Sequence, residues 1–400
     1  MRVFELNTFL GGSTGRIATD IAQYAIVQGA ETIIGFGAGS VPQGAETYAL
    51  RIGGPVGRKW HGALRKLLDA EGYGSLLATK RLIHFLQQYQ PDVIHLHNLH
   101  GCYVNHKLLF RYLQQSGIPV VWTLHDCWAF TGHCAYFDRV GCDRWKTGCF
   151  RCPQKGEYPA CIGIGGSKRN YARKHNLFPS LPNLTLVAPC VWLQKIVAES
   201  FFRNVPCRVI YNGVDRNRFY PVKSDLREQY GIGDKLLILA VASEWEERKG
   251  IRLLPELAGK LGERCQLVVI GVTPEQCKAL PASILGIQKT ANVRELAAWY
   301  TVADCLANPT LEDNMPMVNL ESFACGTPVV AFDTGGCAEA IPDTCGTVTP
   351  KGDVDAMADA IHNIARKKAA FSQACFSQAE CFDAEASAKA YWDLYQEVLR

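Results

Sequence analysis

The acidic residue Glu321, in the segment 311–328 that also contains Asp313, could bind a sugar or a ribose. Glu321 falls on an otherwise apolar helical segment, where a carboxylate is costly unless hydrogen-bond donors satisfy it. The hydroxyls of a sugar or a ribose are suitable donors. Pro316 fits the first turn of that helix, with Asp313 or Asn314 as its cap, and the N–H groups of such a turn can hold a diphosphate. The alternative is a surface Glu on a half-exposed helix.

A basic residue that could neutralise a phosphate follows an apolar strand in the same half of the chain. Lys249 lies in the charged run 246–250, after the expected strand Leu236–Val241. Open α/β sheets bind ligands at the carboxyl ends of their strands, so Lys249 could stabilise a leaving phosphate. The alternative is a solvated loop without a ligand.

A glycine-rich turn, residues 10–16, follows the first expected strand and precedes a helix. Its glycines allow a ligand to approach the backbone closely. The spacing is G-G-x-x-G, and the second strand ends at Gly35–Gly37 without a ribose-binding acid. Both features disfavour a nicotinamide dinucleotide site. A tight strand–helix turn without a ligand remains the alternative.

Six of the seventeen cysteines lie in one stretch, residues 127–161. Four of them, Cys134, Cys142, Cys149 and Cys152, end in a CxxC pair and are compatible with a tetrahedral structural zinc. His133 or Cys127 could substitute as ligands, and disulfides or plain thiols are the alternatives. We expect a reducing compartment, because no secretory segment precedes the first strand.

Apolar runs of strand length alternate with amphipathic helical patterns, which predicts parallel, doubly wound sheets. The expected strands are 3–7, 32–36, 93–96, 120–124, 184–188, 207–211, 236–241, 266–270 and 328–332. The expected helices are 16–28, 78–89, 191–202, 355–365 and 385–399.

A breaker segment, residues 204–206, predicts the boundary between two domains. We expect an N-terminal Rossmann-like domain over 1–190 with a cysteine-rich insertion at 127–161. A second Rossmann-like domain over 207–378 follows, beginning with a new βαβ series at Cys207. The final segment, 379–400, carries a helix too aromatic for a free tail, so we expect it to pack back on the N-terminal domain.

The composition excludes several classes of protein. Apolar residues make up 48% and charged residues 20%, which is ordinary for a globular chain and excludes disordered and fibrous ones. A net charge of +4 argues against a nucleic-acid binder. No apolar run reaches the roughly 20 residues that span a bilayer. We therefore expect a cytoplasmic protein.

In this order the motifs resemble the retaining family 4 glycosyltransferases of GT-B fold, along nearly the whole chain. The resemblance includes 212–215 with Phe219 after the domain link, and 324–330. The segment Trp122–Trp128 and the cysteine-rich stretch resemble the colanic-acid-type exopolysaccharide branch. The resemblance implies two Rossmann-like domains that face a central cleft, with a C-terminal crossover helix.

The resemblance also implies roles for individual residues. It makes Asp313 and His125 the catalytic positions, with Asp313 at the sugar hydroxyls and His125 beside the sugar. Glu321 would bind the ribose and Lys249 the leaving phosphate. The residues placed around the donor are Gly11, Gly12, Gly15, Arg248, Lys249, Gly286, Ile287, Asn314, Met315, Pro316, Met317 and Glu321. The family usually has Glu in place of Asp313 and Arg in place of Ser243, and Arg248 is a candidate for the missing charge.

The implied activity is that of a retaining hexosyltransferase in polysaccharide biosynthesis. A UDP- or GDP-linked sugar would pass to a glycan or to a polyprenyl-diphosphate-linked acceptor. We expect catalysis without a metal, because Lys249 and the 314–317 turn supply positive charge to the leaving group. We expect front-side attack, because no carboxylate nucleophile is evident. The alternatives are a nucleotide-sugar epimerase or phosphorylase of the same fold, and a non-catalytic zinc-bearing module that binds sugar nucleotides.

Two basic stretches predict a surface for a partner. Arg51, Arg58, Lys59, Arg65 and Lys66 occur without an acid between them, and Trp60 lies among them. Residues 168–174 form a second run. A basic, aromatic face suits an anionic membrane surface, which would make the protein peripheral at the inner face of the membrane. Solvated helices are the alternative.

Overall fold

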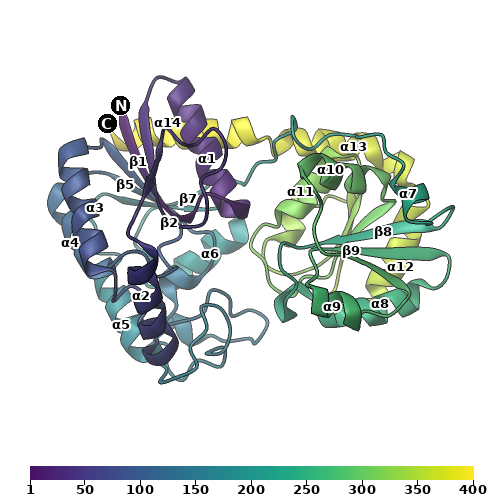
Figure 1. The fold of residues 1–400 in the computed structure, drawn as a ribbon, viewed down its shortest axis with the longest axis horizontal. Helices are drawn as coiled ribbons and strands as arrows, with labels where there is room; N and C mark the ends of the chain where they lie inside the picture. Colours follow the sequence, from purple (N-terminus) through teal and green to yellow (C-terminus); the bar gives the residue numbers. More distant parts are fainter. The chain divides into compact units, whose positions relative to one another are not determined.

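The computed structural model describes residues 1–400, which form two compact units (Figure 1). The N-terminal domain comprises Met1–Tyr211 together with Ser387–Arg400. The C-terminal domain comprises Asn212–Ala386. Each has one parallel sheet with helices on both faces, as the continuous apolar strands of the sequence predict.

The N-terminal sheet has seven parallel strands in the order β3-β2-β1-β4-β5-β6-β7. The strands are β1 (Arg2–Phe9), β2 (Glu31–Ala38), β3 (Ala49–Arg51), β4 (Val93–Leu96), β5 (Val120–Thr123), β6 (Leu184–Ala188) and β7 (Cys207–Val209). The strand order reverses direction between β1 and β4, which is the place where open α/β sheets bind ligands.

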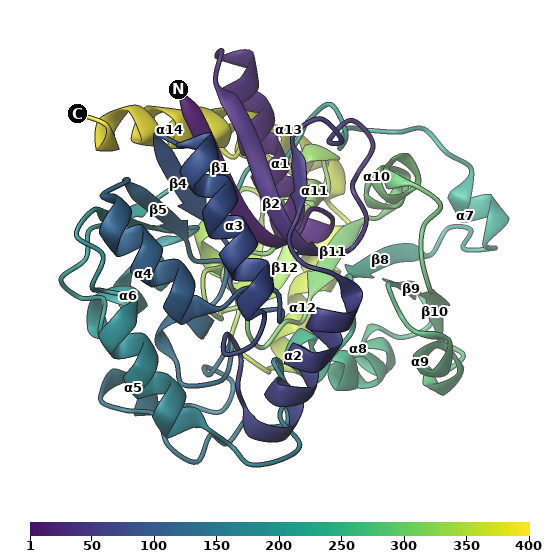
Figure 2. The same cartoon turned by 60° about the vertical axis from the view of Figure 1, so that its left-hand side comes forward.

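The helices of the N-terminal domain cover both faces of this sheet. They are α1 (Gly12–Val27), α2 (Pro55–Leu68), α3 (Leu76–Tyr89), α4 (His106–Ser116), α5 (Ser167–Leu177) and α6 (Val191–Glu199). Val3 of β1 faces the cluster that contains α1, whereas the adjacent Phe4 stacks near Phe85 of α3. Figure 2 shows α3 and α4 side by side on that second face.

The segment between β5 and α5 has little regular structure. It contains two short 3-10 helices, η1 (Trp128–Phe130) and η2 (Arg144–Lys146). Its end is fixed to α2, because the backbone N–H groups of Ile162 and Gly163 donate to the carbonyl of Lys66. This segment is the cysteine-rich insertion that the sequence predicts.

The C-terminal sheet has six parallel strands in the order β10-β9-β8-β11-β12-β13. The strands are β8 (Leu236–Val241), β9 (Cys265–Ile270), β10 (Ile284–Ile287), β11 (Cys305–Asn308), β12 (Val329–Phe332) and β13 (Gly346–Thr349). Here the strand order reverses between β8 and β11.

The C-terminal domain contains seven α-helices and three 3-10 helices outside the final helix. They are α7 (Leu226–Gln229), η3 (Glu247–Lys249), η4 (Ile251–Leu253), α8 (Leu254–Leu261), α9 (Pro274–Ala279), α10 (Val293–Val302), α11 (Met317–Ala324), η5 (Cys337–Ala340), α12 (Val354–Ala365) and α13 (Lys368–Cys381). Helices α8 and α12 bury their apolar stripes against one face of the sheet. Asp353, which the sequence places at a helix start, caps α12 by accepting from the N–H of Ala356.

The last helix, α14 (Ala384–Val398), packs on the N-terminal domain as the sequence predicts. Its buried Tyr391 and Tyr395 lie against Val3, Val93 and Val121 of the sheet. In Figures 1 and 2 it lies beside β1, with the two chain termini close together.

The predicted domain boundary needs a correction. The strand at Cys207 does not open the second domain, because β7 pairs with β6 and completes the N-terminal sheet. The first part of the N-terminal domain therefore ends at Tyr211, rather than at residue 190 or 206. The chain returns to this domain at Ser387, rather than at residue 379. Strand pairing decides this, and the breaker at 204–206 is only the turn between α6 and β7.

No helix has both the length and the apolar character needed to cross a bilayer.

Candidate functional site

Lys249 and Asp313 form an ion pair in the C-terminal domain. Lys249 ends η3, in the connection after β8, and Asp313 lies in the connection after β11. These two strands are neighbours in the sheet, and the strand order reverses between them. The pair therefore lies where doubly wound sheets hold ligands, as the sequence predicts for Lys249.

Asp313 is ionised in this setting. Burial alone would raise the pKa of its carboxyl, but Lys249 and Arg248 outweigh burial and hold the pKa below its ordinary value. Arg248 also donates to Glu246 and to the carbonyl of Glu312. Arg248 thus brings a second positive charge close to Asp313.

The turn that follows Lys249 depends on Gly250. This glycine has a φ of +81°, and an added Cβ would lie 2.1 Å from the carbonyl oxygen of Pro309. Only glycine allows the β8 connection to approach the β11 connection this closely. The close approach brings Lys249 within reach of Asp313.

Helix α11 begins at Met317 without a side-chain cap. The expectation that Asp313 or Asn314 caps it is wrong: the N-cap residue is Pro316, and the Asp313 carboxylate instead accepts from the N–H of Asn314. Asn314 and Met315 are buried, and Met317 is half-buried. Because no side chain caps it, the first turn of α11 presents backbone N–H groups that can bind an anion.

Glu321 is buried in the middle of α11, with 3% of its surface exposed. Its Oε2 accepts a hydrogen bond of 2.9 Å from the hydroxyl of Tyr300 on α10. The structure therefore excludes the alternative of a surface carboxylate on a half-exposed helix.

Gly286 and Ile287 close strand β10 at the outer edge of the C-terminal sheet. The carbonyl of Gly286 accepts from the Cys277 thiol on α9, and the carbonyl of Ile287 accepts from the N–H of Gly271. Because Gly286 has no side chain, a ligand at this end of β10 would be bound through backbone groups.

The glycine turn of the N-terminal domain follows β1. Gly11 and Gly12 are exposed, with open space where a Cβ would be, and Gly11 is the N-cap of α1 without a side-chain cap. Gly15 differs, because an added Cβ would lie 2.3 Å from the carbonyl carbon of Leu10. The absence of a side chain at Gly15 therefore allows α1 to pack closely on the turn. Gly11 and Gly12, in contrast, leave room for a ligand.

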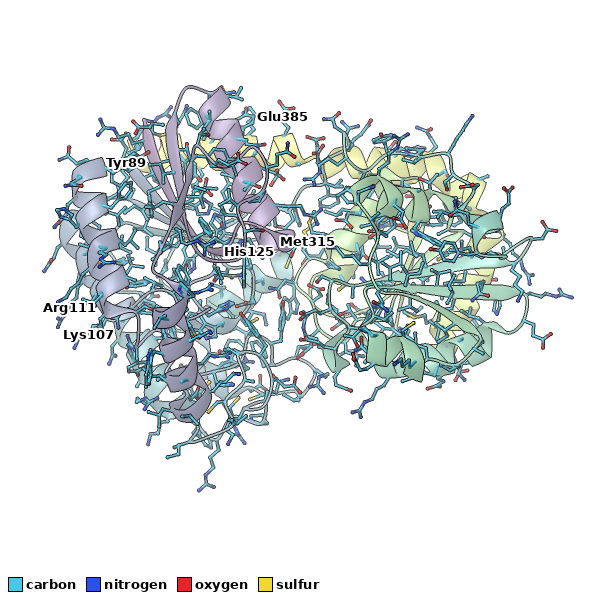
Figure 3. All side chains as sticks on the ribbon, viewed as in Figure 1. Tyr89, Lys107, Arg111, His125, Met315 and Glu385 are labelled. Atoms are coloured by element: carbon cyan, nitrogen blue, oxygen red, sulfur yellow. The ribbon has the colours of Figure 1, made fainter.

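His125 follows β5 and belongs to a chain of three hydrogen-bonded groups. Its Nε2 lies 3.0 Å from Nδ1 of His97, and Nε2 of His97 lies 3.1 Å from the carboxylate of Glu5. His97 and Glu5 are completely buried. Burial lowers the pKa of His125 to about 4, so its ring is neutral at pH 7. Figure 3 labels this residue.

Asp126, next to His125, is held by a second set of hydrogen bonds. Its carboxylate lies 2.9 Å from Nε2 of His100, whose Nδ1 lies 2.8 Å from the hydroxyl of Tyr158. Burial raises the pKa of Asp126, but the His100 interactions and the N–H of Trp128 bring it below its ordinary value. His100, Asp126, Trp128 and His125 line a small pocket in the N-terminal domain.

The four cysteines predicted as metal ligands line one small pocket, together with His133. All are free thiols, and Cys134 is buried. Two tighter groups of ligand-type side chains occur elsewhere, Glu5–His95–His97 and His61–Glu71–Cys102, with ligand atoms within 4.8 Å of one another. In both groups, however, the histidine nitrogens already have protein hydrogen-bond partners.

The sequence analysis missed Glu5 and His97 as site residues. Glu5 is an acid in the middle of an apolar strand, and His95 and His97 alternate along and after β4. Ionisable groups within apolar strands are the signal that could have found them.

Two family models match most of the chain. Residues 14–218 match the model described as "Glycosyltransferase Family 4", and residues 235–367 match the model described as "Glycosyl transferases group 1".

Individual relatives agree with these matches. WcaC of Escherichia coli K12, described as a colanic acid biosynthesis glycosyl transferase, is 27% identical over 372 residues, which cover 88% of either chain. A GDP-mannose-dependent alpha-(1-6)-phosphatidylinositol monomannoside mannosyltransferase of Mycolicibacterium smegmatis is 34% identical over 173 residues, which cover 38% of this chain and 45% of the relative.

Solved structures share the fold along the whole chain. Sucrose-phosphate synthase from Thermosynechococcus elongatus has a TM-score of 0.73 at 17% identity, covering 99% of this chain and 98% of that one. HepE from Anabaena in complex with UDP-glucose has a TM-score of 0.69 at 15% identity, covering 99% and 100%. These similarities confirm the predicted GT-B fold.

Proposed function

Because this chain belongs to glycosyltransferase family 4, whose members are retaining enzymes that use nucleotide-sugar donors, we propose that it transfers a hexose from a UDP- or GDP-linked donor to a growing glycan or lipid-linked oligosaccharide. The observation that carries the proposal is the Lys249–Asp313 pair beside the uncapped first turn of α11. Cation, carboxylate and backbone N–H groups together suit a sugar diphosphate.

In the proposed reaction, the C-terminal domain stabilises the leaving nucleoside diphosphate. Lys249 and Arg248 provide positive charge, and the N–H groups of Met317 and its neighbours provide hydrogen bonds. Asp313 orients the sugar by accepting hydrogen bonds from its hydroxyls. Positive charge fixed in advance lowers the cost of breaking the bond between the sugar and the diphosphate.

Glu321 binds the ribose in this proposal. Its carboxylate is buried and accepts from Tyr300, which fixes its orientation before the donor arrives. A ribose diol would supply further hydrogen bonds to this carboxylate. Backbone groups of Gly286 and Ile287 would then contact the base, which is uracil or guanine.

His125 positions the reacting sugar rather than accepting a proton. With its pKa lowered to about 4 by burial, the ring is neutral and too weakly basic to hold the acceptor's proton at pH 7. We propose front-side attack, in which the acceptor hydroxyl enters on the face that the diphosphate leaves. The acceptor proton would then pass to the departing phosphate oxygen.

Two observations support the proposed acceptor: the similarity of the chain to WcaC and the surface of α2. Helix α2 bears no acidic residue and exposes Lys59, Trp60 and Lys66. A groove lies between α2 and α3, lined by apolar side chains including Trp60 and Leu77, which are each 72% exposed. A basic, apolar surface of this kind suits an anionic membrane that presents a polyprenyl-linked acceptor.

The experiment that tests the donor proposal compares thermal unfolding with UDP, GDP and ADP. A ligand at 100 times its dissociation constant adds about 2.7 kcal/mol to the free energy of unfolding. We expect one of the first two nucleotides to raise Tm and ADP to have no effect. Release of that nucleotide from a matching sugar donor then separates an enzyme from a non-catalytic binding module. No shift with any nucleotide would contradict the proposal.

A further inference from the structure

The pocket in the cysteine-rich insertion has a chemistry that glycosyl transfer does not require. Cys134, Cys142, Cys149 and Cys152 line it, although they are 18 residues apart in sequence at the extremes. The surrounding segment has only the two short 3-10 helices η1 and η2. A segment with so little regular structure needs another source of order.

Two of these thiols already interact directly. Cys134 and Cys152 share a side-chain hydrogen bond. Their sulfur atoms therefore already lie close together, as two ligands of one metal ion must.

His133 adds a nitrogen donor to the same pocket. Its Nδ1 lies 2.6 Å from the carboxylate of Asp69, whereas its Nε2 is buried and has no hydrogen-bond partner. Asp69 is itself fixed by the N–H of Gly166. A carboxylate that holds one nitrogen of an imidazole and leaves the other available is the usual arrangement around a zinc-bound histidine.

Lys174 is an independent observation that indicates negative charge nearby. Its side chain is buried, lies over the ring of Trp128, and donates to the carbonyls of Trp128 and Thr131 at 2.5 and 3.0 Å. It forms no ion pair with a carboxylate. A buried ammonium group is costly unless an anion compensates it. Zinc bound by three or four thiolates carries net negative charge and would compensate it.

We propose that this pocket is a structural zinc site held by the thiolates of Cys134, Cys149 and Cys152 and by one further ligand, Cys142 or His133. Each thiol releases its proton to solvent when zinc binds, and the sulfurs draw in to about 2.3 Å from the metal. Tetrahedral coordination by four protein ligands leaves no open position, so the ion orders the insertion and takes no part in sugar transfer.

The test is the metal content of the full chain, purified without a polyhistidine tag. We expect about one zinc ion per chain by elemental analysis. Replacement by Co²⁺ should give the thiolate-to-cobalt absorption bands of a tetrahedral site. A folded chain without a transition metal would overturn the proposal. If the four cysteines react with thiol reagents only after reduction, they form disulfides, and the zinc proposal is wrong.

Variants identify the fourth ligand. Cys149→Ser should abolish stoichiometric zinc, and either Cys142→Ser or His133→Ala, but not the other, should do the same. The matched control is Cys207→Ser, a half-buried cysteine on β7 that should keep the metal. If neither Cys142→Ser nor His133→Ala changes zinc content, the ligand set is wrong.

A measurement on the unaltered chain tests the zinc site even if the cysteine variants do not fold. A strong chelator should lower the Tm of the zinc-loaded protein, and added zinc should restore it. Lys174→Met should increase the rate of zinc loss to the chelator about tenfold or more, as expected for a neighbour that compensates the charge of the centre. Zinc content is independent of nucleotide binding, so these results do not depend on the proposed donor.

Discussion

The Nδ1 atom of His97 lies 3.0 Å from the Nε2 atom of His125, and the two rings stack with 11° between their planes. The other nitrogen of His97 lies 3.1 Å from Glu5, whose second carboxylate oxygen has no hydrogen-bond partner. The chain from Glu5 through His97 therefore holds the ring of His125 in its orientation.

The first prediction concerns this chain of groups. Glu5→Ala should lower kcat about 10- to 100-fold with little change in the KM for the donor, because a misplaced ring loses transition-state geometry rather than donor contacts. Glu5→Gln, which keeps the shape, should recover part of the loss. The control is Thr32→Val on β2, which alters a buried polar group without a link to His125. Equal kcat values in all three variants would contradict the role of Glu5.

The second prediction concerns acid stability. Burial lowers the pKa values of His95, His97, His106 and His125 below the ordinary 6.5. A histidine of this kind binds protons more readily when unfolded, so it stabilises the fold above pH 6.5 and loses that contribution as the pH falls toward 4. Burial raises the pKa of Glu5, which has the opposite effect over the same range.

Burial also lowers the pKa of His61. Five histidines outnumber one glutamate, so we expect the free energy of unfolding to decrease between pH 6.5 and about 4.5. Urea titrations at several pH values measure it. The decrease should be smaller in His106→Gln, which removes one of the five groups. A free energy that rises on acidification would show that Glu5 dominates.

The third prediction concerns the leaving group. Lys249→Ala should lower kcat about 10²- to 10³-fold, because a cation that meets developing phosphate charge is lost. Lys260→Ala is the matched control, since Lys260 forms an ion pair with Asp355 at the surface of the same domain. Steady-state kinetics with the donor identified by thermal shift distinguish the two. Comparable losses in both variants would rule out a specific role for Lys249.

The fourth prediction concerns the buried acid of α11. Glu321→Ala should abolish the thermal shift by the nucleoside diphosphate and reduce transfer by about two orders of magnitude or more. It also leaves the Tyr300 hydroxyl without its acceptor, which should cost about 1–3 kcal/mol of folding free energy. Glu263→Ala, an exposed acid in the same domain, should alter neither quantity. Near-normal turnover of a folded Glu321→Ala protein would refute the donor assignment.

The fifth prediction concerns the membrane surface. Replacing Lys59 and Lys66 by Gln should weaken binding to anionic vesicles about 30-fold, from about 1 kcal/mol for each charge. The control replaces Lys107 and Arg111, two exposed charges on α4 that Figure 3 labels. Vesicle sedimentation at low and high salt measures the affinity. Binding that is absent, indifferent to salt, or weakened equally by the control pair would exclude α2 as the contact surface.

Long, continuous apolar strands could be located from the sequence alone. The predicted bounds of β4, β6 and β8 agree with the structure, because burial on both faces requires apolar residues throughout. Strands β3, β10, β11 and β13, each of three or four residues, were missed. Strand β7 was found but assigned to the wrong sheet, because pairing with β6 depends on distant backbone groups.

The sequence by itself determined the fold class, the family resemblance and the identities of Lys249, Asp313, Glu321 and the clustered cysteines, because residue type and local spacing carry that information. Only the tertiary structure decided which groups meet. It paired Lys249 with Asp313, and it joined Glu5 to His97 and His125. These contacts connect residues 28 to 92 positions apart, and the order of strands in a sheet brings such residues together where no local pattern records it.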